Sequence, residues 1–234
     1  MSAHGFFITG TDTGVGKTLV SAALLHAFAS LGYQVVGMKP VAAGAGKIDG
    51  IWQNDDVLQL QAAASVATYA AADPLWVNPY LLRVPVAPHI AADYQGVSIE
   101  LPRIRDAYEH LAALADVVIV EGVGGFKVPL SATRDSADLA GYLGLPIILV
   151  VGMRMGCLNH ALLTAEAIAA RGLQLVGWVA NRVDPEMAAY EENLAALRLR
   201  LPGALLAEFP YSESPDSKAL STLMAPIKLA ALIR

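Results

Sequence analysis

The chain has 234 residues, of which 55% are hydrophobic and 16% are charged, and its formal net charge is −5 at pH 7. These values are typical of a soluble α/β protein with a buried sheet, and they exclude an intrinsically disordered chain. The acidic balance, without a run of basic residues, argues against a nucleic-acid-binding surface, and the apolar run 145–151 is too short to span a bilayer. We therefore expect a cytoplasmic protein that binds neither nucleic acid nor membranes.

Apolar runs that are typical of buried strands alternate with helical patterns along the chain. In chain order, strands are predicted at residues 5–9, 34–38, 116–120, 146–151, 173–179 and 204–209. Helices are predicted at residues 18–31, 55–65, 104–114, 158–171 and 187–201 and from residue 218 onward. The glycine-rich stretch 41–51 is expected to be a mobile loop, and the proline-containing stretch 75–88 to be irregular. The alternation predicts one domain, residues 1–234, with a mostly parallel sheet covered by helices on both faces.

A glycine-rich loop, GTDTGVGKT, joins the first predicted strand to the first predicted helix at residues 10–18. The P-loop of nucleotide-binding proteins has a glycine, four further residues, and then Gly-Lys followed by Ser or Thr. Gly16, Lys17 and Thr18 supply the second half of this pattern, but its first glycine falls on Thr11, so Gly10 makes the loop one residue longer. The strand before the loop and the helix after it favour a P-loop NTPase-like site over a simple capped turn.

The same loop predicts how a nucleotide is held. Backbone N–H groups of residues 14–18 are expected to point into one concavity at a helix N-terminus, which favours anions. Lys17 is expected to reach the β- and γ-phosphates, and the Thr18 hydroxyl to face Mg²⁺. The loop residues predicted to bind the nucleotide are Gly14, Val15, Gly16, Lys17, Thr18 and Leu19.

Polar residues follow three predicted strands at the carboxyl edge of the sheet, where parallel sheets bind ligands. Glu121 precedes a glycine run that lets the backbone approach a ligand, which favours a role beside Mg²⁺ or the attacking group over a solvated acid. Lys39 either adds positive charge beside a transferring phosphoryl group or extends into solvent. Asn181 suits a purine edge and equally a turn, and Asp56 is either a Mg²⁺ ligand or part of a helix cap.

The order of several motifs resembles that of dethiobiotin synthetases over almost the whole chain. The extended phosphate loop is itself typical of that family, and the stretch around Asp56 matches a family segment that carries a metal-binding aspartate. The other motifs that carry the resemblance are KPVA (39–42), VNPY (77–80), PHI (88–90), VEGVGG (120–125), ILVVG (148–152), GCLNHA (156–161) and GWVAN (177–181).

The resemblance implies a cytoplasmic homodimer of the biotin pathway, with ATP as co-substrate and Mg²⁺ as cofactor. Dethiobiotin synthetases take 7,8-diaminopelargonic acid and carbon dioxide, and one amine captures the carbon dioxide as a carbamate. The γ-phosphoryl group of ATP then moves to a carbamate oxygen. The second amine attacks the activated carbon and closes a cyclic urea, so that ADP and phosphate are released.

The resemblance also implies roles for individual residues. Lys17 and Lys39 would hold the carbamate and the γ-phosphate, with Thr13 hydrogen-bonded to the carbamate. The residues that would surround Mg²⁺ are Thr18, Asp56 and Glu121. The further ATP contacts implied are Gly122, Gly124, Asn181, Pro210 and Tyr211. Asn159, at a helix N-terminus, would meet the substrate's carboxylate across the dimer interface.

Two positions depart from the family pattern. Ala43 stands in the substrate-binding segment where the family often has serine, which removes a hydroxyl that could hydrogen-bond the substrate. The segment around Asp216 aligns loosely, so a nucleotide contact by Asp216 is only weakly supported. Neither departure touches the phosphate-binding and metal-binding residues.

Other classes of protein have a similar ATP domain. ATPases of the partitioning and division-positioning type carry a lysine five residues before the loop lysine, where this chain has Asp12, and this difference argues against a switch. Cobyrinate-type synthetases usually bring a glutaminase domain with a nucleophilic cysteine, whereas the one cysteine here, Cys157, stands at a predicted helix start and is expected to be inert. Lys39 together with Glu121 disfavours a simple nucleotide-binding module. Together with the resemblance to dethiobiotin synthetases, which implies ring closure, these differences favour a phosphoryl-transferring, ring-closing ligase.

Overall fold

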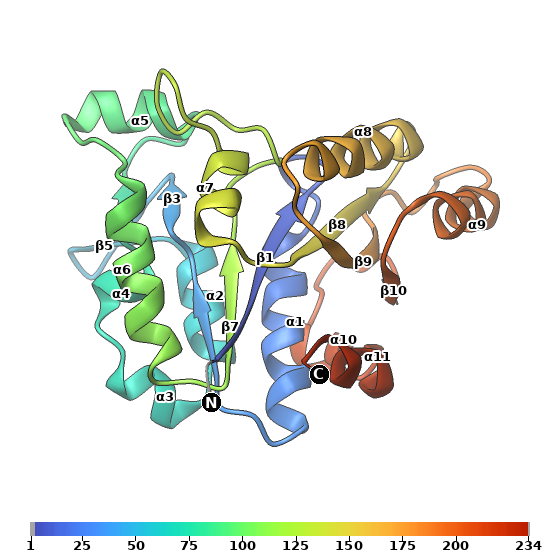
Figure 1. Cartoon of the computed structure of the whole chain (residues 1–234), viewed down its shortest axis with the longest axis horizontal. Coiled ribbons are helices and arrows are strands. Elements are labelled where there is room, and N and C mark those ends of the chain that lie inside the picture. Colours follow the sequence, from blue (N-terminus) through green and yellow to red (C-terminus); the bar gives the residue numbers. More distant parts are fainter. Residues whose placement is uncertain (1–2, 234) are drawn as a thin grey trace.

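A six-stranded parallel sheet forms the centre of the molecule (Figure 1), as the sequence predicts. The computed structural model describes residues 3–233. The strand order is β10-β9-β8-β1-β7-β2, and each neighbouring pair is parallel. The strands are β1 (His4–Gly10), β2 (Val35–Met38), β7 (Val117–Glu121), β8 (Ile147–Met153), β9 (Leu175–Arg182) and β10 (Ala204–Phe209).

Helices cover both faces of this sheet. They are α1 (Lys17–Ser30), α2 (Asp55–Ala63), α3 (Val66–Ala71), α4 (Pro74–Val77), α5 (Pro88–Gln95), α6 (Leu101–Ala112), α7 (Ser136–Leu143), α8 (Cys157–Ala170), α9 (Tyr190–Arg200), α10 (Ser217–Ser221) and α11 (Pro226–Leu232). Successive strand residues face opposite sides, so Phe7 packs in one apolar cluster with α6 to α9, and Phe6 and Ile8 pack in a second cluster with α1. No helix within residues 3–233 is long and apolar enough to cross a membrane.

The carboxyl ends of the strands gather the candidate functional residues at one edge of the sheet. In Figure 1 the arrows of β1 and β7 point towards the same, upper edge. β1 leads into the phosphate loop, β2 is followed by Lys39, β7 ends at Glu121, and Asn181 is the penultimate residue of β9. Parallel pairing therefore brings together residues that lie far apart in the sequence.

Two stretches that were expected to be irregular contain short regular elements. They are β3 (Val41–Ala43), β4 (Gly46–Ile48), β5 (Ile51–Gln53), α4 and β6 (Tyr80–Leu82). β4 and β5 form a hairpin whose two-residue turn has positive φ at Asp49 (51°) and Gly50 (81°). The prediction of a mobile loop at 41–51 was therefore wrong, although Asp-Gly is itself a hairpin signal. The three-residue strands β3 and β6 pair although they lie far apart in the sequence. Such short, distant partners show no pattern in the local sequence that would predict the pairing.

Candidate functional site

The phosphate loop lies between β1 and α1, as the sequence predicts. Gly16 is the N-cap of α1 with φ of 85°, and Lys17 is the first helical residue. Val15 is buried beneath the loop, and a Cβ at Gly10 or at Gly152 would lie 2.7 Å or 2.6 Å from a Val15 methyl carbon. Gly10 is therefore required because the end of β1 passes close to Val15, which explains a glycine at this position of the longer loop.

Lys17 folds back over its own loop. Its Nζ donates to the Asp12 carbonyl oxygen at 3.0 Å. Burial and the positive charge of Lys39 lower the pKa of Lys17 to about 8. The carboxylate of Asp12 pairs with Arg154 at 2.5 Å, which ties the loop to the segment after β8.

Lys39 bridges two carboxylates. Its Nζ lies 2.5 Å from Glu121 Oε1 and 2.8 Å from Asp56 Oδ2. Burial by itself would lower the pKa of Lys39, but the two carboxylates outweigh burial and raise it. Burial likewise acts to raise the pKa of Asp56, yet the Lys39 ammonium holds that pKa below its usual value of 3.8. This cluster joins β7 and α2 to the residue that follows β2.

The cluster has the oxygen donors that a divalent cation requires. Glu121 is fully buried, and its Oε2 has no hydrogen-bond partner among the described residues. Thr18 Oγ1 donates to the other carboxylate oxygen, Oε1, at 2.8 Å. Mg²⁺ prefers oxygen ligands and is usually bound by one or two carboxylates together with phosphates. Within residues 3–233, no group of three or more His, Cys, Asp or Glu side chains is placed to hold a metal ion.

Two asparagines position the cluster. Asn78 Nδ2 donates to the Lys39 carbonyl oxygen at 2.6 Å, and Lys39 N donates to the Val77 carbonyl oxygen at 2.8 Å. Asn54 caps α2, because its Oδ1 accepts from Asp56 N at 3.1 Å. The capping side chain of α2 is thus Asn54, and not Asp56, which the sequence left as either a cap residue or a Mg²⁺ ligand. Asn78 was not singled out from the sequence, although the VNPY motif contains it.

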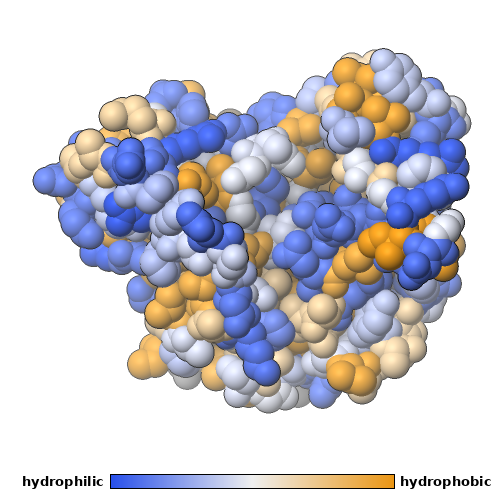
Figure 2. All heavy atoms as spheres, turned by 180° about the vertical axis from the view of Figure 1, so that it is seen from behind, coloured by the Kyte–Doolittle hydropathy of each residue, from blue (hydrophilic) through white to orange (hydrophobic). Residues whose placement is uncertain are grey.

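A cavity of about 860 Å³ opens beside this cluster. The sequence-predicted residues that line it are Thr13, Gly14, Gly16, Lys17, Thr18, Lys39, Ala43, Asp56, Glu121 and Gly124. The lining residues that sequence reasoning missed are Pro85, Val86, Ala87, Pro88, Val123, Lys127, Val128 and Pro129. Figure 2 shows the molecule hollowed along its upper edge between two raised parts. The cavity combines a phosphate-binding loop, two lysines and two carboxylates with an apolar wall.

Comparisons with known proteins agree with this arrangement. A family model described as an AAA domain matches residues 4–219. An ATP-dependent dethiobiotin synthetase of Aromatoleum aromaticum is 56% identical over 233 residues, which cover 99% of this chain and 97% of the relative. A second, from Nitrosospira multiformis, is 54% identical over 220 residues, which cover 94% of each chain. This chain belongs to the dethiobiotin synthetase family.

Solved structures with lower identity show the fold alone. The septum site-determining protein MinD of Pyrococcus horikoshii has a TM-score of 0.56 at 18% identity, with 98% of this chain and 95% of that chain covered. The receptor FtsY of Elizabethkingia anophelis has a TM-score of 0.54 at 15% identity, with 98% and 65% covered. These likenesses confirm the P-loop NTPase-like architecture. In this dethiobiotin synthetase family member, the position five residues before the loop lysine is Asp12, and Asp12 forms an ion pair with Arg154.

Of the implied adenine-contact residues of this dethiobiotin synthetase family member, Asn181 contacts the loop, and none of them lines the cavity. Asn181 is buried, and its Nδ2 donates to the Val15 carbonyl oxygen at 2.9 Å. Phe209 of β10 pairs with Asn181, so Pro210 and Tyr211 leave the sheet at the same edge, where both are exposed. Asn181 thus supports the loop directly, a contact that the sequence pattern did not indicate.

The remaining implied residues lie outside the cavity lining. Leu19 and Gly122 are not part of its lining, although the Gly122 carbonyl oxygen accepts from Lys39 at 3.4 Å. Asn159 is exposed in the first turn of α8 and does not line the cavity either. Asp216 caps α10 by accepting from Lys218 N at 2.9 Å, which gives it a structural role.

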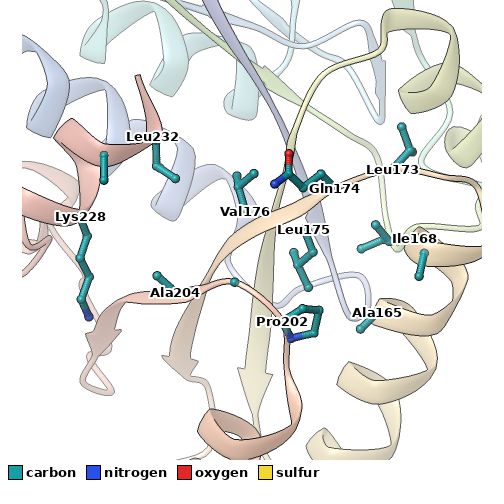
Figure 3. A pocket seen from close by; sticks show the side chains of 13 residues that line it. Ala165, Ile168, Leu173, Gln174, Leu175, Val176, Pro202, Ala204, Lys228 and Leu232 are labelled. Carbon is teal, nitrogen blue, oxygen red and sulfur yellow. The ribbon is translucent and has the colours of Figure 1, made fainter. Parts of the chain in front are cut away.

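A second cavity, of about 800 Å³, lies at the amino end of β9 (Figure 3). Side chains from α8, from the loop before β10 and from α11 surround it, among them Ile168, Pro202 and Leu232. Gln174 and Lys228 are the polar side chains of its lining. Because it has no carboxylates and no phosphate-binding loop, this cavity does not suit a metal–nucleotide complex.

Proposed function

We propose that this chain is an ATP-dependent dethiobiotin synthetase that joins carbon dioxide to 7,8-diaminopelargonic acid and closes a cyclic urea. One observation carries the proposal: a phosphate loop shares its cavity with the buried Lys39, which is paired to two carboxylates. A nucleotide-binding module needs only the loop. A second lysine and two acids at the γ-phosphate end suit phosphoryl transfer.

In the proposed reaction, one amine of the substrate captures carbon dioxide as a carbamate. A carbamate carbon is a poor electrophile and must be activated before the second amine can attack it. A carbamate oxygen therefore attacks the γ-phosphorus and ADP leaves, which gives a carbamic-phosphoric anhydride. The second amine then attacks the carbamoyl carbon, and phosphate departs with the former carbamate oxygen. Thr13 and Lys39 would hold the carbamate, and Lys17 with Lys39 would balance the charge that develops on the γ-phosphoryl group.

Thr18, Asp56 and Glu121 would hold Mg²⁺, and the buried Glu121 Oε2 atom, which lacks a partner among the described residues, supports this set. Mg²⁺ held by these residues would neutralise charge on the phosphates of ATP. Because Lys39 neutralises the same carboxylates in the nucleotide-free protein, it would turn towards the carbamate when Mg²⁺ and ATP bind. Burial in this cluster keeps water from competing for its ammonium.

The proposal also includes contacts outside the cavity and an assembly. The backbone of residues 14–19 would bind the phosphates, with Gly122 and Gly124 beside them. Asn181, Pro210 and Tyr211 would contact the adenine. The active form would be a cytoplasmic homodimer in which Asn159 of one subunit's α8 meets the carboxylate of a substrate bound by the other subunit.

Phosphate release tests the proposed function. Purified protein is given Mg²⁺, ATP, 7,8-diaminopelargonic acid and bicarbonate, and each is then omitted in turn. We expect release to require both the diamine and bicarbonate, with a cyclic urea detected by mass spectrometry. Release from ATP alone, unchanged by the diamine, would contradict the proposal and favour an ATPase switch.

A further inference from the structure

Lys127 is a cation of the cavity lining to which neither the sequence motifs nor the proposed reaction gives a role. It lies on the loop between β7 and α7, and 52% of its side chain is exposed. Thr13, Lys127 and Val128 line both the main cavity and an adjoining hollow of about 340 Å³. Lys127 therefore lies where the two hollows meet, on the same stretch of wall as the residue expected to contact the carbamate.

The cavity lining differs in polarity from one group of residues to another. Lys17 of the phosphate loop and Lys39 of the carboxylate cluster are buried, with 6% and 3% of each residue exposed. Much of the remaining lining is apolar, from Pro85, Val86, Ala87, Pro88, Val123 and Val128. Lys127, half exposed, adds positive charge outside the buried cluster. Such a lining suits a ligand with a reactive polar end, an aliphatic chain and an anionic tail.

A neighbouring carboxylate holds the Lys127 ammonium in place without using up its hydrogen-bonding capacity. Lys127 Nζ lies 2.5 Å from Asp135 Oδ2. Asp135 also caps α7, because its Oδ1 accepts from Asp138 N at 2.9 Å, and its Oδ2 lies 3.6 Å from a guanidinium nitrogen of Arg171. The charge of Asp135 is therefore shared among several partners. An ammonium group has three N–H donors, so a second carboxylate can bind to Lys127.

We propose that Lys127 binds the carboxylate of the substrate and so determines specificity for a diamine that carries an acidic tail. The inference rests on the proposed function, in which the substrate has vicinal amines at one end and a carboxylate at the other. A carboxylate suits Lys127 better than a phosphate does, because the two buried lysines already serve the phosphate end. Lys127 would contact the substrate carboxylate from the same subunit that binds the amines. The N-terminus of α8 of the partner subunit would contact the same carboxylate from the other side of the dimer interface.

Kinetics with two substrates test this role. The first substrate is 7,8-diaminopelargonic acid, and the second is the same vicinal diamine with a methyl group in place of the carboxylate. Lys127→Met is expected to raise the KM for the acid about tenfold with kcat little changed, and to leave the KM for the methyl analogue unchanged. Lys127→Arg is expected to restore most of the lost affinity. Lys218→Met, on α10 outside the cavity, is the matched control, and thermal unfolding of each variant checks that the fold is retained.

Other outcomes overturn the inference. An equal rise in KM for both substrates, or an equal fall in kcat, would mean that Lys127 acts at the carbamate or on the fold. Unchanged kinetics with both substrates would mean that the Lys127–Asp135 pair is only a surface ion pair. Failure of the wild-type protein to form a cyclic urea would overturn the proposed function and this inference together. If the wild-type protein forms the cyclic urea and Lys127→Met forms it with the same KM and kcat, only the inference about Lys127 is overturned.

Discussion

The buried ammonium group of Lys39 is neutralised by the carboxylates of Glu121 and Asp56. Lys39 and Glu121 have side chains that are 4% and 0% exposed, whereas that of Asp56 is 40% exposed. Removal of one member of a buried ion pair leaves an uncompensated charge and costs far more than removal of both. Stability and catalysis can therefore be separated by a double-mutant cycle at Lys39 and Glu121.

We expect Lys39→Met to lower the free energy of unfolding by about 3 kcal/mol, because Glu121 stays buried without its partner. The double variant Lys39→Met/Glu121→Gln is expected to regain most of that stability. Each variant of the cycle should lose turnover by a factor of about 10² or more, since Lys39→Met removes a cation beside the phosphoryl group and Glu121→Gln removes a carboxylate proposed to hold Mg²⁺. Urea denaturation and phosphate release measure the two quantities. A stable double variant with parental turnover would remove both residues from the chemistry.

Gly14 and Gly16 of the phosphate loop are expected to tolerate alanine to different degrees. Gly14 and Gly16 both have positive φ, at 74° and 85°, so alanine strains either backbone. A Cβ at Gly16 would lie 2.3 Å from Asn181 Nδ2, whereas a Cβ at Gly14 meets nothing within 4 Å. Gly16→Ala is therefore expected to lose clearly more stability and ATP affinity than Gly14→Ala does. Denaturation and calorimetric titration with ATP test this, and equal losses would show that the Asn181 contact is unimportant.

Some of these side chains could be predicted from the sequence and others could not. Lys17 and Thr18 follow from the loop pattern, and Glu121 from its place between a buried strand and a glycine run. The sequence left Asp56 undecided, because a cap and a metal ligand use the same residue type, and the structure shows that the cap is Asn54. The Lys39 bridge and the wall residue Lys127 depend on distant contacts, which local patterns do not record.

At the scale of elements, α7 begins with a capping box that carries several charges. Asp135 N donates to Asp138 Oδ2 at 2.8 Å, and Arg171, at the C-terminus of α8, pairs with Asp138 at 2.5 Å. Burial acts to raise the pKa of Asp138, but the Asp135 N–H and the Arg171 guanidinium outweigh it and hold that pKa below 3.8. This box also fixes Asp135, which positions the Lys127 ammonium.

The sign of the resulting pH dependence follows from the lowered pKa. A group whose pKa is lower in the folded state contributes stability above its unfolded pKa and loses it as the pH falls through the folded value. We expect Asp138→Ala to lower the free energy of unfolding by about 1 kcal/mol near neutral pH. The gap between the variant and the wild type should close as the pH falls below about 3.8. A gap that stayed constant with pH would show that the carboxylate charge is not involved.

Most of the long elements were predictable and most of the short ones were not, but the four-residue strand β2 was predicted and the eight-residue helices α5 and α7 were missed. The buried runs at β1, β7, β8, β9 and β10 are apolar almost throughout, so their positions follow from composition and length. β3 and β6 have three residues each, and α3 and α4 have six and four, too few for a periodic pattern. The strands β4 and β5 of the hairpin also have three residues each, too few to show an alternating pattern.

At the scale of the whole molecule, the parallel sheet explains why the site exists. β2, β7 and β9 end at the same edge as β1, so residues separated by more than a hundred positions meet at the phosphate loop. The alternation of strands and helices in the sequence predicts this sheet and its edge. It does not predict the strand order, which decides that Lys39 and Glu121 are neighbours on adjacent strands β2 and β7.

The fate of the carbon dioxide oxygen atoms distinguishes a ring-closing ligase from an ATPase. In the proposed reaction, the carbamate oxygen that attacks the γ-phosphorus comes from carbon dioxide and leaves with the phosphate. With ¹⁸O-labelled carbon dioxide, mixed rapidly with enzyme, diamine, Mg²⁺ and ATP in unlabelled water, the released phosphate should carry one ¹⁸O atom and the cyclic urea another. Phosphate without label, which instead takes its oxygen from water, would contradict a ring-closing ligase and indicate simple hydrolysis of ATP.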